Sequence, residues 1–169
     1  MFRFPSVIQM TFALMLAAVA VAGCKKEIGD DCTTAADCNP NGSRSCDQTQ
    51  PGGYCTIQGC DETSCPSEAV CMRFFPAQFL TKACDPHPDG GIAQAADAGV
   101  PVCNADEICL NAGLCAPLST ELRYCVRSCT TDGDCRDGYE CRLSGTRGSM
   151  ALTSNPDAIV HFCAPLSTG

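Results

Sequence analysis

Cysteine is the residue type whose number and spacing could support chemistry here, since 17 of the 169 residues are cysteines. Thiolates bind metals, exchange with disulfides or pair with each other. Structural zinc sites favour cysteines separated by two to four residues, often completed by histidine, and redox-active thiols favour a separation of two. A separation of two residues does not occur in the chain. Only His87 and His161 are present to complete a metal site. The cysteines therefore predict no metal and no cofactor, but a disulfide scaffold of the kind found in exported proteins.

Nucleophilic catalysis needs a nucleophile, a base and a group that orients the base. The chain has no G-x-S-x-G motif, and none of its 19 acidic residues is marked out by spacing. The sequence thus predicts that the protein is not an enzyme.

An acidic turn at Asp132–Asp134 raises the question of calcium. The twelve-residue calcium loop places acids at positions 1, 3 and 5 and glycine at position 6. Counted from Asp132, position 5 is Arg136 and position 6 is Asp137. A solvated acidic turn is the favoured interpretation, and a calcium site at Asp132–Asp134 stays open.

The formal net charge of −8 limits the partners of the protein. An acidic surface disfavours nucleic acid and adsorption to anionic lipids. Any attachment to a membrane would therefore be covalent or transmembrane.

The first 23 residues have the composition of a signal peptide. Arg3 gives a basic start, a mostly apolar run follows from residue 7 to 21, and small residues end the segment. The run is short for a transmembrane helix, which needs about 20 apolar residues. Residues 1–23 are therefore predicted to be removed on export.

The residues Val21-Ala22-Gly23-Cys24 resemble the lipobox of bacterial lipoproteins. The resemblance implies cleavage before Cys24 and lipidation of its sulfur, with palmitate-like acyl chains that attach the protein to the membrane. Lys25 follows where lipoproteins retained in the inner membrane often have Asp, so the outer membrane is favoured. Residues 24–31 would then be a lipidated polar tether. The odd number of cysteines agrees with lipidation, because assigning Cys24 to lipid leaves 16 cysteines that can all pair.

These 16 cysteines show an internal repeat. Tyr54-Cys55 aligns with Tyr124-Cys125 at an offset of 70, and extending the alignment gives two sets of eight. The sequence predicts module 1 at 32–84, a linker rich in Pro, Gly, Ala and Asp at 85–102, and module 2 at 103–169. The predicted disulfide residues are Cys32, Cys38, Cys46, Cys55, Cys60, Cys65, Cys71, Cys84, Cys103, Cys109, Cys115, Cys125, Cys129, Cys135, Cys141 and Cys163.

The fold class that follows is small and disulfide-rich, with two tandem eight-cysteine modules of short irregular β-hairpins and loops and little helix after the signal peptide. Four bridges are expected in each module. Eight cysteines allow on the order of a hundred pairing patterns, so the connectivity stays open. A finer repeat, in which Cys32-TTAAD-Cys38 matches Cys129-TTDGD-Cys135, allows each module to divide into two four-cysteine halves.

Two segments are candidate contact loops. One carries Phe74, Phe75 and Phe79, and the other is the loop 142–162 with Arg142 and Arg147. Exposed apolar or basic loops on a cross-linked scaffold are natural contact surfaces. The alternative is that the three phenylalanines cover the small core of their own module.

The sequence therefore favours a non-enzymatic lipoprotein of the cell envelope with a binding, adhesion or structural role. Its partners would be the membrane, through lipid on Cys24, and a protein or glycan ligand. The motifs GGYC, CTTxxDC and DCRDGYEC resemble cysteine-rich lipoproteins of predatory and social soil bacteria, a resemblance that implies no defined activity. The alternative is a protease inhibitor or blocking module that presents the loop 142–162, with Arg142 or Arg147 filling a trypsin-like pocket.

Overall fold

The structure is a computed structural model that describes residues 26–86, 103–155 and 158–166. The predicted signal peptide, 1–23, and the predicted lipid attachment site, Cys24, lie outside the described residues. So do residues 87–102, which make up most of the predicted linker.

The described residues form short strands and very little helix. The strands are β1 (Ser45–Cys46), β2 (Cys55–Thr56), β3 (Ala69–Phe74), β4 (Glu107–Leu110), β5 (Leu114–Pro117), β6 (Leu122–Arg127), β7 (Tyr139–Leu143), β8 (Ser149–Ala151) and β9 (His161–Pro165). The helical elements are α2 (Ala35–Cys38) and the 3-10 turns η2 (Ala77–Phe79), η3 (Leu118–Thr120) and η4 (Asp132–Asp134). The predicted small disulfide-rich fold is confirmed. The elements are short because most gaps between successive cysteines leave no room for longer helices or strands.

All sixteen cysteines of the described residues are in disulfides, and the eight bridges follow one rule. They divide the cysteines into four sets of four, in which the first cysteine bonds to the third and the second bonds to the fourth. We call these sets the first, second, third and fourth units. In order, their cysteines are Cys32, Cys38, Cys46 and Cys55; Cys60, Cys65, Cys71 and Cys125; Cys84, Cys103, Cys109 and Cys115; and Cys129, Cys135, Cys141 and Cys163.

Each unit closes on one antiparallel strand pair. The pairs β1–β2, β3–β6, β4–β5 and β7–β9 each place the third and fourth cysteines of a unit directly opposite one another. The Cα atoms of the first-to-third bridges are 5.8 to 6.0 Å apart, and those of the second-to-fourth bridges are 5.4 to 5.6 Å apart. The bridges thus fasten the loop that precedes each strand pair onto the pair itself.

The third unit is inserted in the chain between the third and fourth cysteines of the second unit. The Cys65–Cys125 bridge of the second unit therefore spans 60 positions. This bridge and Cys84–Cys109 both join the range 32–84 to the range 103–169. The expectation of four bridges inside each eight-cysteine module is corrected accordingly, because β3 of the first range pairs with β6 of the second.

The repeat alignment is right over part of its length. Cys55 and Cys125 are both fourth cysteines, and the three cysteines after each are the first, second and third of the next unit. Upstream the alignment sets Cys32, a first cysteine, against Cys103, a second cysteine, because the inserted unit shifts the count. The finer match of CTTAADC with CTTDGDC is confirmed, since both run from a first to a second cysteine.

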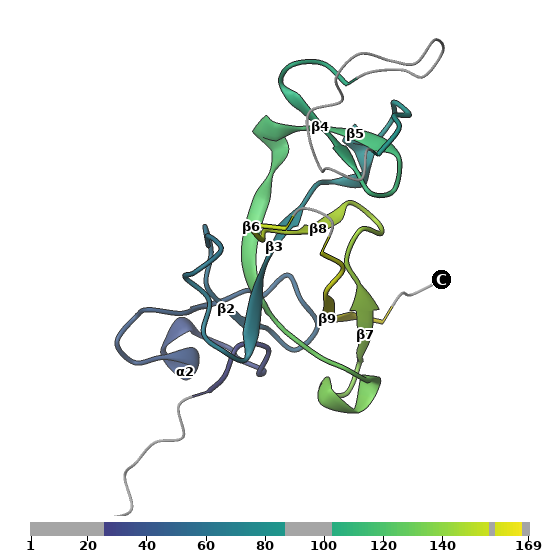
Figure 1. Ribbon diagram of the computed structural model, residues 1–169. Helices are drawn as coiled ribbons and strands as arrows, with labels where there is room; N and C mark the ends of the chain where they lie inside the picture. The colour runs from purple at the N-terminus through teal and green to yellow at the C-terminus, as the bar shows by residue number, and fades with distance from the viewer. Residues whose placement is uncertain (1–25, 87–102, 156–157, 167–169) are drawn as a thin grey trace, which may run out of the picture.

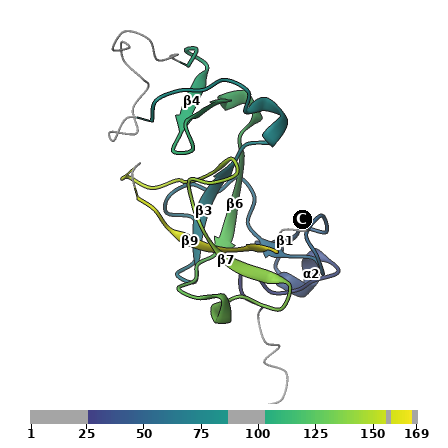
Figure 2. The same cartoon turned by 90° about the vertical axis from the view of Figure 1, so that its right-hand side faces the viewer.

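Strand β3 lies between β6 and β8 at the centre of the fold (Figure 1). The main core gathers around it and includes Met72, Ile28 and Phe162, all 2% exposed or less. A second, smaller cluster of Phe75, Leu110, Ala116 and Met150 attaches the third unit. The third unit (β4 and β5) stands at one end of the molecule, and α2 lies at the other (Figures 1 and 2).

Candidate functional site

A cavity of about 320 Å³ opens between the first, second and fourth units. Its walls come from the segment before β2, from strands β3 and β6, and from the β7–β9 pair with the turn that follows β7. Five aromatic side chains line it: Tyr54, Phe74, Tyr124, Tyr139 and Phe162. A concave site of this volume with mostly apolar walls lies at the lower end of the range of small-ligand sites.

Three of the five rings occupy one equivalent position, directly before the fourth cysteine of their unit. Tyr54 precedes Cys55, Tyr124 precedes Cys125 and Phe162 precedes Cys163. Successive side chains on a strand point to opposite faces. In β6 and β9 the bridged cysteine therefore points to one face of the strand and the ring before it points to the other, and Tyr54 holds the same position just before β2. The repeat thus delivers three equivalent rings to one cavity.

The rings support one another in two groups. Tyr54 and Tyr139 are stacked, with ring centroids 5.6 Å apart and an interplanar angle of 29°. Phe74 meets Phe162 edge to face at 5.9 Å and meets Tyr124 at 6.3 Å. Both arrangements are favourable for aromatic pairs. Phe74 and Tyr124 are half-buried, whereas Tyr54, Tyr139 and Phe162 are buried. Ring surface for a ligand is therefore offered mainly by Phe74 and Tyr124.

Arg136 holds the tyrosine pair in place. Its guanidinium carbon lies 4.3 Å from the ring centroid of Tyr139 and 5.6 Å from that of Tyr54. Its Nη2 donates to the Tyr139 hydroxyl at 2.6 Å and to the carbonyl oxygen of Pro51 at 2.7 Å. A cation over an aromatic face is attracted to the ring. Arg136 thus ties the fourth unit to the first beside two tyrosines of the cavity wall.

Both stacked tyrosines are held neutral. Burial raises the pKa of Tyr54 to about 12, although the backbone N–H of Arg127 donates to its oxygen at 3.0 Å. Burial also raises the pKa of Tyr139, against the opposing effect of Arg136. Neither hydroxyl is prepared to act as a base near neutral pH, so the tyrosines suit packing and hydrogen bonding.

The predicted contact residues fall into two groups. Phe74, Arg142 and Arg147 all line the cavity. Phe75 is buried in the second core cluster, with the guanidinium of Arg73 over its ring at 5.4 Å. Phe79, in η2, is 43% exposed and lies outside the cavity lining. The phenylalanine segment therefore divides between cavity wall, core and surface.

Three charged side chains stand among the lining residues: Asp47, Arg142 and Arg147. Arg142 donates to Glu140 at 2.5 Å and to the carbonyl oxygen of Pro165 at 2.8 Å, so it is fixed along the β7–β9 pair. The cavity therefore combines an aromatic wall with a charged lining.

Arg147 sits in a tight turn and has a positive φ of 49°. The next residue, Gly148, has φ 73°, and a Cβ atom there would lie 2.3 Å from the carbonyl oxygen of Phe75. The turn is thus pressed against the end of β3. A trypsin-like pocket requires an arginine in an extended loop. Arg147 lies in this turn and Arg142 lies in β7, so neither meets the requirement. The described part of the loop 142–162 gives the inhibitor alternative no supporting observation.

The acidic turn at Asp132–Asp134 uses its carboxylates on its own backbone. Asp134 accepts from the N–H groups of Thr130 and Thr131 at 2.8 and 2.9 Å, and these hydrogen bonds lower its pKa. Asp132 accepts from the N–H of Cys141 at 2.8 Å. Hydrogen-bonding roles within the fold thus account for both carboxylates, which favours the structural interpretation over calcium.

The same arrangement recurs in the first unit. Asp37 accepts at 2.8 Å from the hydroxyl of Thr33 and from the N–H groups of Thr33 and Thr34, and these bonds lower its pKa to about 2. The repeated Cys-Thr-Thr-x-x-Asp-Cys sequence is therefore a hydrogen-bonded turn that presents two cysteines to the following strands.

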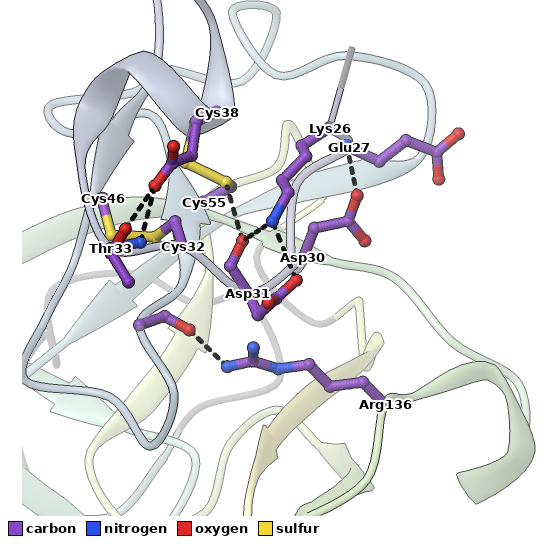
Figure 3. Close-up of polar contacts among 12 residues, drawn as sticks. Lys26, Glu27, Asp30, Asp31, Cys32, Thr33, Cys38, Cys46, Cys55 and Arg136 are labelled. Carbon is purple, nitrogen blue, oxygen red and sulfur yellow. Dashed lines mark hydrogen bonds and ion pairs between the residues drawn. A yellow bond between two sulfur atoms is a disulfide. The ribbon is translucent and has the colours of Figure 1, made fainter. Parts of the chain in front are cut away.

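Residues 26–31, predicted as a polar tether, are packed into the fold. Ile28 is fully buried in the main core. The N–H of Gly29 donates to the carbonyl oxygen of Cys55 at 2.9 Å, and the N–H of Cys55 donates to that of Asp30 at 2.9 Å. Figure 3 shows Lys26 turned back towards Asp31, which its Nζ contacts at 3.0 Å. The tether expectation is corrected because one apolar residue, Ile28, carries the segment into the core.

The sequence does not predict five residues of the site, namely Tyr54, Tyr124, Tyr139, Phe162 and Arg136. The sequence signal for three of them is an aromatic residue directly before the fourth cysteine of a unit. This signal can be recognised only once the four units are known.

Within the described ranges, no helix has the length and apolar character needed to cross a membrane. Comparison with family models, with curated proteins and with solved structures gives no match for this chain.

Proposed function

We propose that the protein is an exported lipoprotein, attached to the bacterial envelope through lipid on Cys24, that binds a ligand in its aromatic cavity without catalysing a reaction. The outer membrane is the proposed location. The observation that carries the binding role is the cavity itself, assembled from equivalent rings of three disulfide-linked units.

Cysteine usage supports export and lipidation. Eight bridges use all sixteen cysteines that follow Cys24, so Cys24 is the odd one among 17. A chain with this many bridges suits an oxidising compartment. A thioether on Cys24 would account for the remaining sulfur.

The walls of the cavity favour a ligand with an apolar ring face, such as a sugar ring of a glycan or an aromatic side chain of a partner protein. Rings of this kind stack on Phe74 and Tyr124, and polar groups of the ligand meet the charged lining at Asp47 and Arg147. Burial raises the pKa of Tyr54 and of Tyr139, so these two hydroxyls stay neutral and are equipped for recognition.

Tyrosine fluorescence tests the binding role with unusual specificity. The chain has three tyrosines and no tryptophan, and all three tyrosines line the cavity. We expect a saturable change in tyrosine emission when the native protein is titrated with envelope glycans or with aromatic peptides, confirmed by calorimetry. Absence of both signals across both panels at millimolar concentration would remove the binding proposal.

Two variants locate the site. Tyr124→Ala removes one half-buried ring of the wall, and we expect affinity to fall about tenfold, as one stacked ring is worth about 1.4 kcal/mol. Phe79→Ala changes an exposed ring outside the cavity and is the matched control. Equal affinities of the two variants would place binding elsewhere.

Lipid attachment is tested separately by the intact mass of protein purified from membranes. We expect loss of residues 1–23 and the added mass of two or three acyl chains. In a Cys24→Ser variant we expect neither acyl mass nor sedimentation with membranes. A mature chain without acyl mass would refute the lipoprotein proposal and leave the cavity untouched.

A further inference from the structure

The start of the described chain is fixed to the fold by several contacts. Besides the burial of Ile28, the carbonyl oxygen of Lys26 accepts a hydrogen bond from Nη1 of Arg44. Arg44 is itself 8% exposed and pairs with Glu68 at 3.1 Å. The backbone is therefore held from Lys26 onward, and no flexible stretch precedes the first unit within residues 26–31.

Two further contacts hold the other side of this segment. Glu27 pairs with Arg127 of β6 at 2.9 Å. Gly29 has φ 98°, and a Cβ atom there would lie 2.9 Å from Cβ of Arg127. The segment thus lies tightly against the central sheet, and its close approach needs glycine at position 29.

The distance from this fixed segment to Cys24 is set by covalent geometry. Only Lys25 separates Cys24 from Lys26. Successive Cα atoms are about 3.8 Å apart, so the Cα atom of Cys24 is at most about 7.6 Å from that of Lys26. A lipid on Cys24 would be held within that distance of the folded body.

We propose that residues Lys26–Asp31 form a membrane seat, which holds the folded body directly against the bilayer in one orientation. This inference rests on the proposed lipidation of Cys24. The surface around Lys26, together with α2 beside it, faces the lipid headgroups, and the third unit stands at the far end (Figures 1 and 2). The partner of this surface is the bilayer that carries the acyl chains.

The charges of the seat fit an anchor that is covalent. Its one cation, Lys26, pairs with Asp31, and its Glu27 pairs with Arg127 of β6. The neighbouring Arg44 pairs with Glu68. Such paired charges give little attraction to anionic headgroups. Orientation therefore comes from the short covalent connection, and the cavity is presented at a fixed height above the membrane.

Neutron reflectometry of the acylated full-length protein on a supported phosphatidylcholine bilayer tests the seat. We expect the protein layer of the native chain to begin at the headgroups. A variant with twelve Gly/Ser residues inserted between Lys25 and Lys26 keeps the lipobox and the whole fold. We expect its layer to move outward and broaden by about 20 Å, the reach of such a linker.

The same twelve residues added after Gly169 are the control, and we expect them to leave the protein layer in place. Equal layer positions for the native chain and the insertion variant, with acyl mass verified in both, would overturn the seat while leaving the lipoprotein proposal standing. Missing acyl mass would overturn both. Hydrogen exchange adds an independent readout, in which we expect backbone amides of 26–38 to be protected by vesicles in the native chain only.

Discussion

Cys71 and Cys125 face each other across β3 and β6, yet each is bonded to a different cysteine of the preceding loop. Between them in the chain lies a complete unit with its own two bridges. The strand pair of the second unit is therefore held together by its backbone pairing and its disulfides, although the whole third unit lies between the two strands in the chain. This relationship explains why two ranges that look independent in sequence form one body.

The insertion predicts that the third unit can be removed. Strands β3 and β6 end opposite each other at Phe74 and Leu122, so residues 76–120 can be replaced by Asn-Gly, which favours a two-residue hairpin turn. We expect a folded protein with six bridges and an intact cavity. Stability should fall by roughly 1.5–3 kcal/mol for each of Phe75 and Met150, which lose their cover. Disulfide mapping and tyrosine fluorescence check this, and scrambled bridges would contradict it.

How far the sequence could predict the fold depended on what the spacing encodes. Cysteine number, parity and short gaps fixed the fold class, and the Cys-Thr-Thr motifs marked two unit starts correctly. Pairing could not follow from spacing, because Cys65 bonds to Cys125 through the register of β3 against β6. That register pairs Met72 with Tyr124 across the inserted third unit and packs Met72 into the main core, and the gaps between cysteines encode neither.

The candidate site was predicted in part for the same reason. The sequence predicts Phe74, Arg142 and Arg147 as contact residues in two separate loops, and the structure places all three in the lining of one cavity. Tyr54 and Tyr124 were visible as aligned residues, but an alignment does not say that equivalent rings converge. Convergence requires the three-dimensional arrangement of the units.

A second prediction concerns Ile28. Replacement by Ala removes a fully buried side chain from the main core, and we expect a loss of about 2–4 kcal/mol in the free energy of unfolding. Lys26→Ala is the control, since an exposed ion pair such as Lys26–Asp31 contributes little to the free energy of unfolding. Urea denaturation monitored by circular dichroism distinguishes them. Equal effects of the two variants would mean that residues 26–31 do not pack as described.

A third prediction concerns Arg136, which stacks on Tyr139 and donates to its hydroxyl. Arg136→Ala should lower stability by about 1–3 kcal/mol and change the near-ultraviolet circular dichroism of the tyrosines. Arg136→Lys should restore little of this, because a flexible ammonium lacks the planar guanidinium that stacks and forks. Full rescue by lysine would show that charge alone matters.

A fourth prediction follows from Asp37, whose pKa in the folded protein is lowered from 3.8 to about 2 by the hydroxyl and N–H of Thr33 and the N–H of Thr34. A carboxyl group whose pKa is lower in the folded than in the unfolded protein stabilises the fold at pH values above its unfolded pKa. This stabilisation is lost as the pH falls through its folded pKa. We therefore expect stability to decline from about pH 4 to pH 2. Asp37→Asn should make that decline shallower.

The control for this measurement is Phe79→Ala, which changes an exposed side chain without an ionisable group. Its acid decline should match that of the native protein. An acid profile of Asp37→Asn that superimposes on the native profile would show that the Thr33–Asp37 hydrogen bonds do not form.

The four-unit disulfide rule is tested most directly by non-reducing peptide mapping of the native protein. The diagnostic fragments are those that contain Cys65 and Cys84. The account predicts that Cys65 is recovered linked to Cys125 and Cys84 linked to Cys109. Recovery of both cysteines in bridges that stay within residues 32–84 would contradict it.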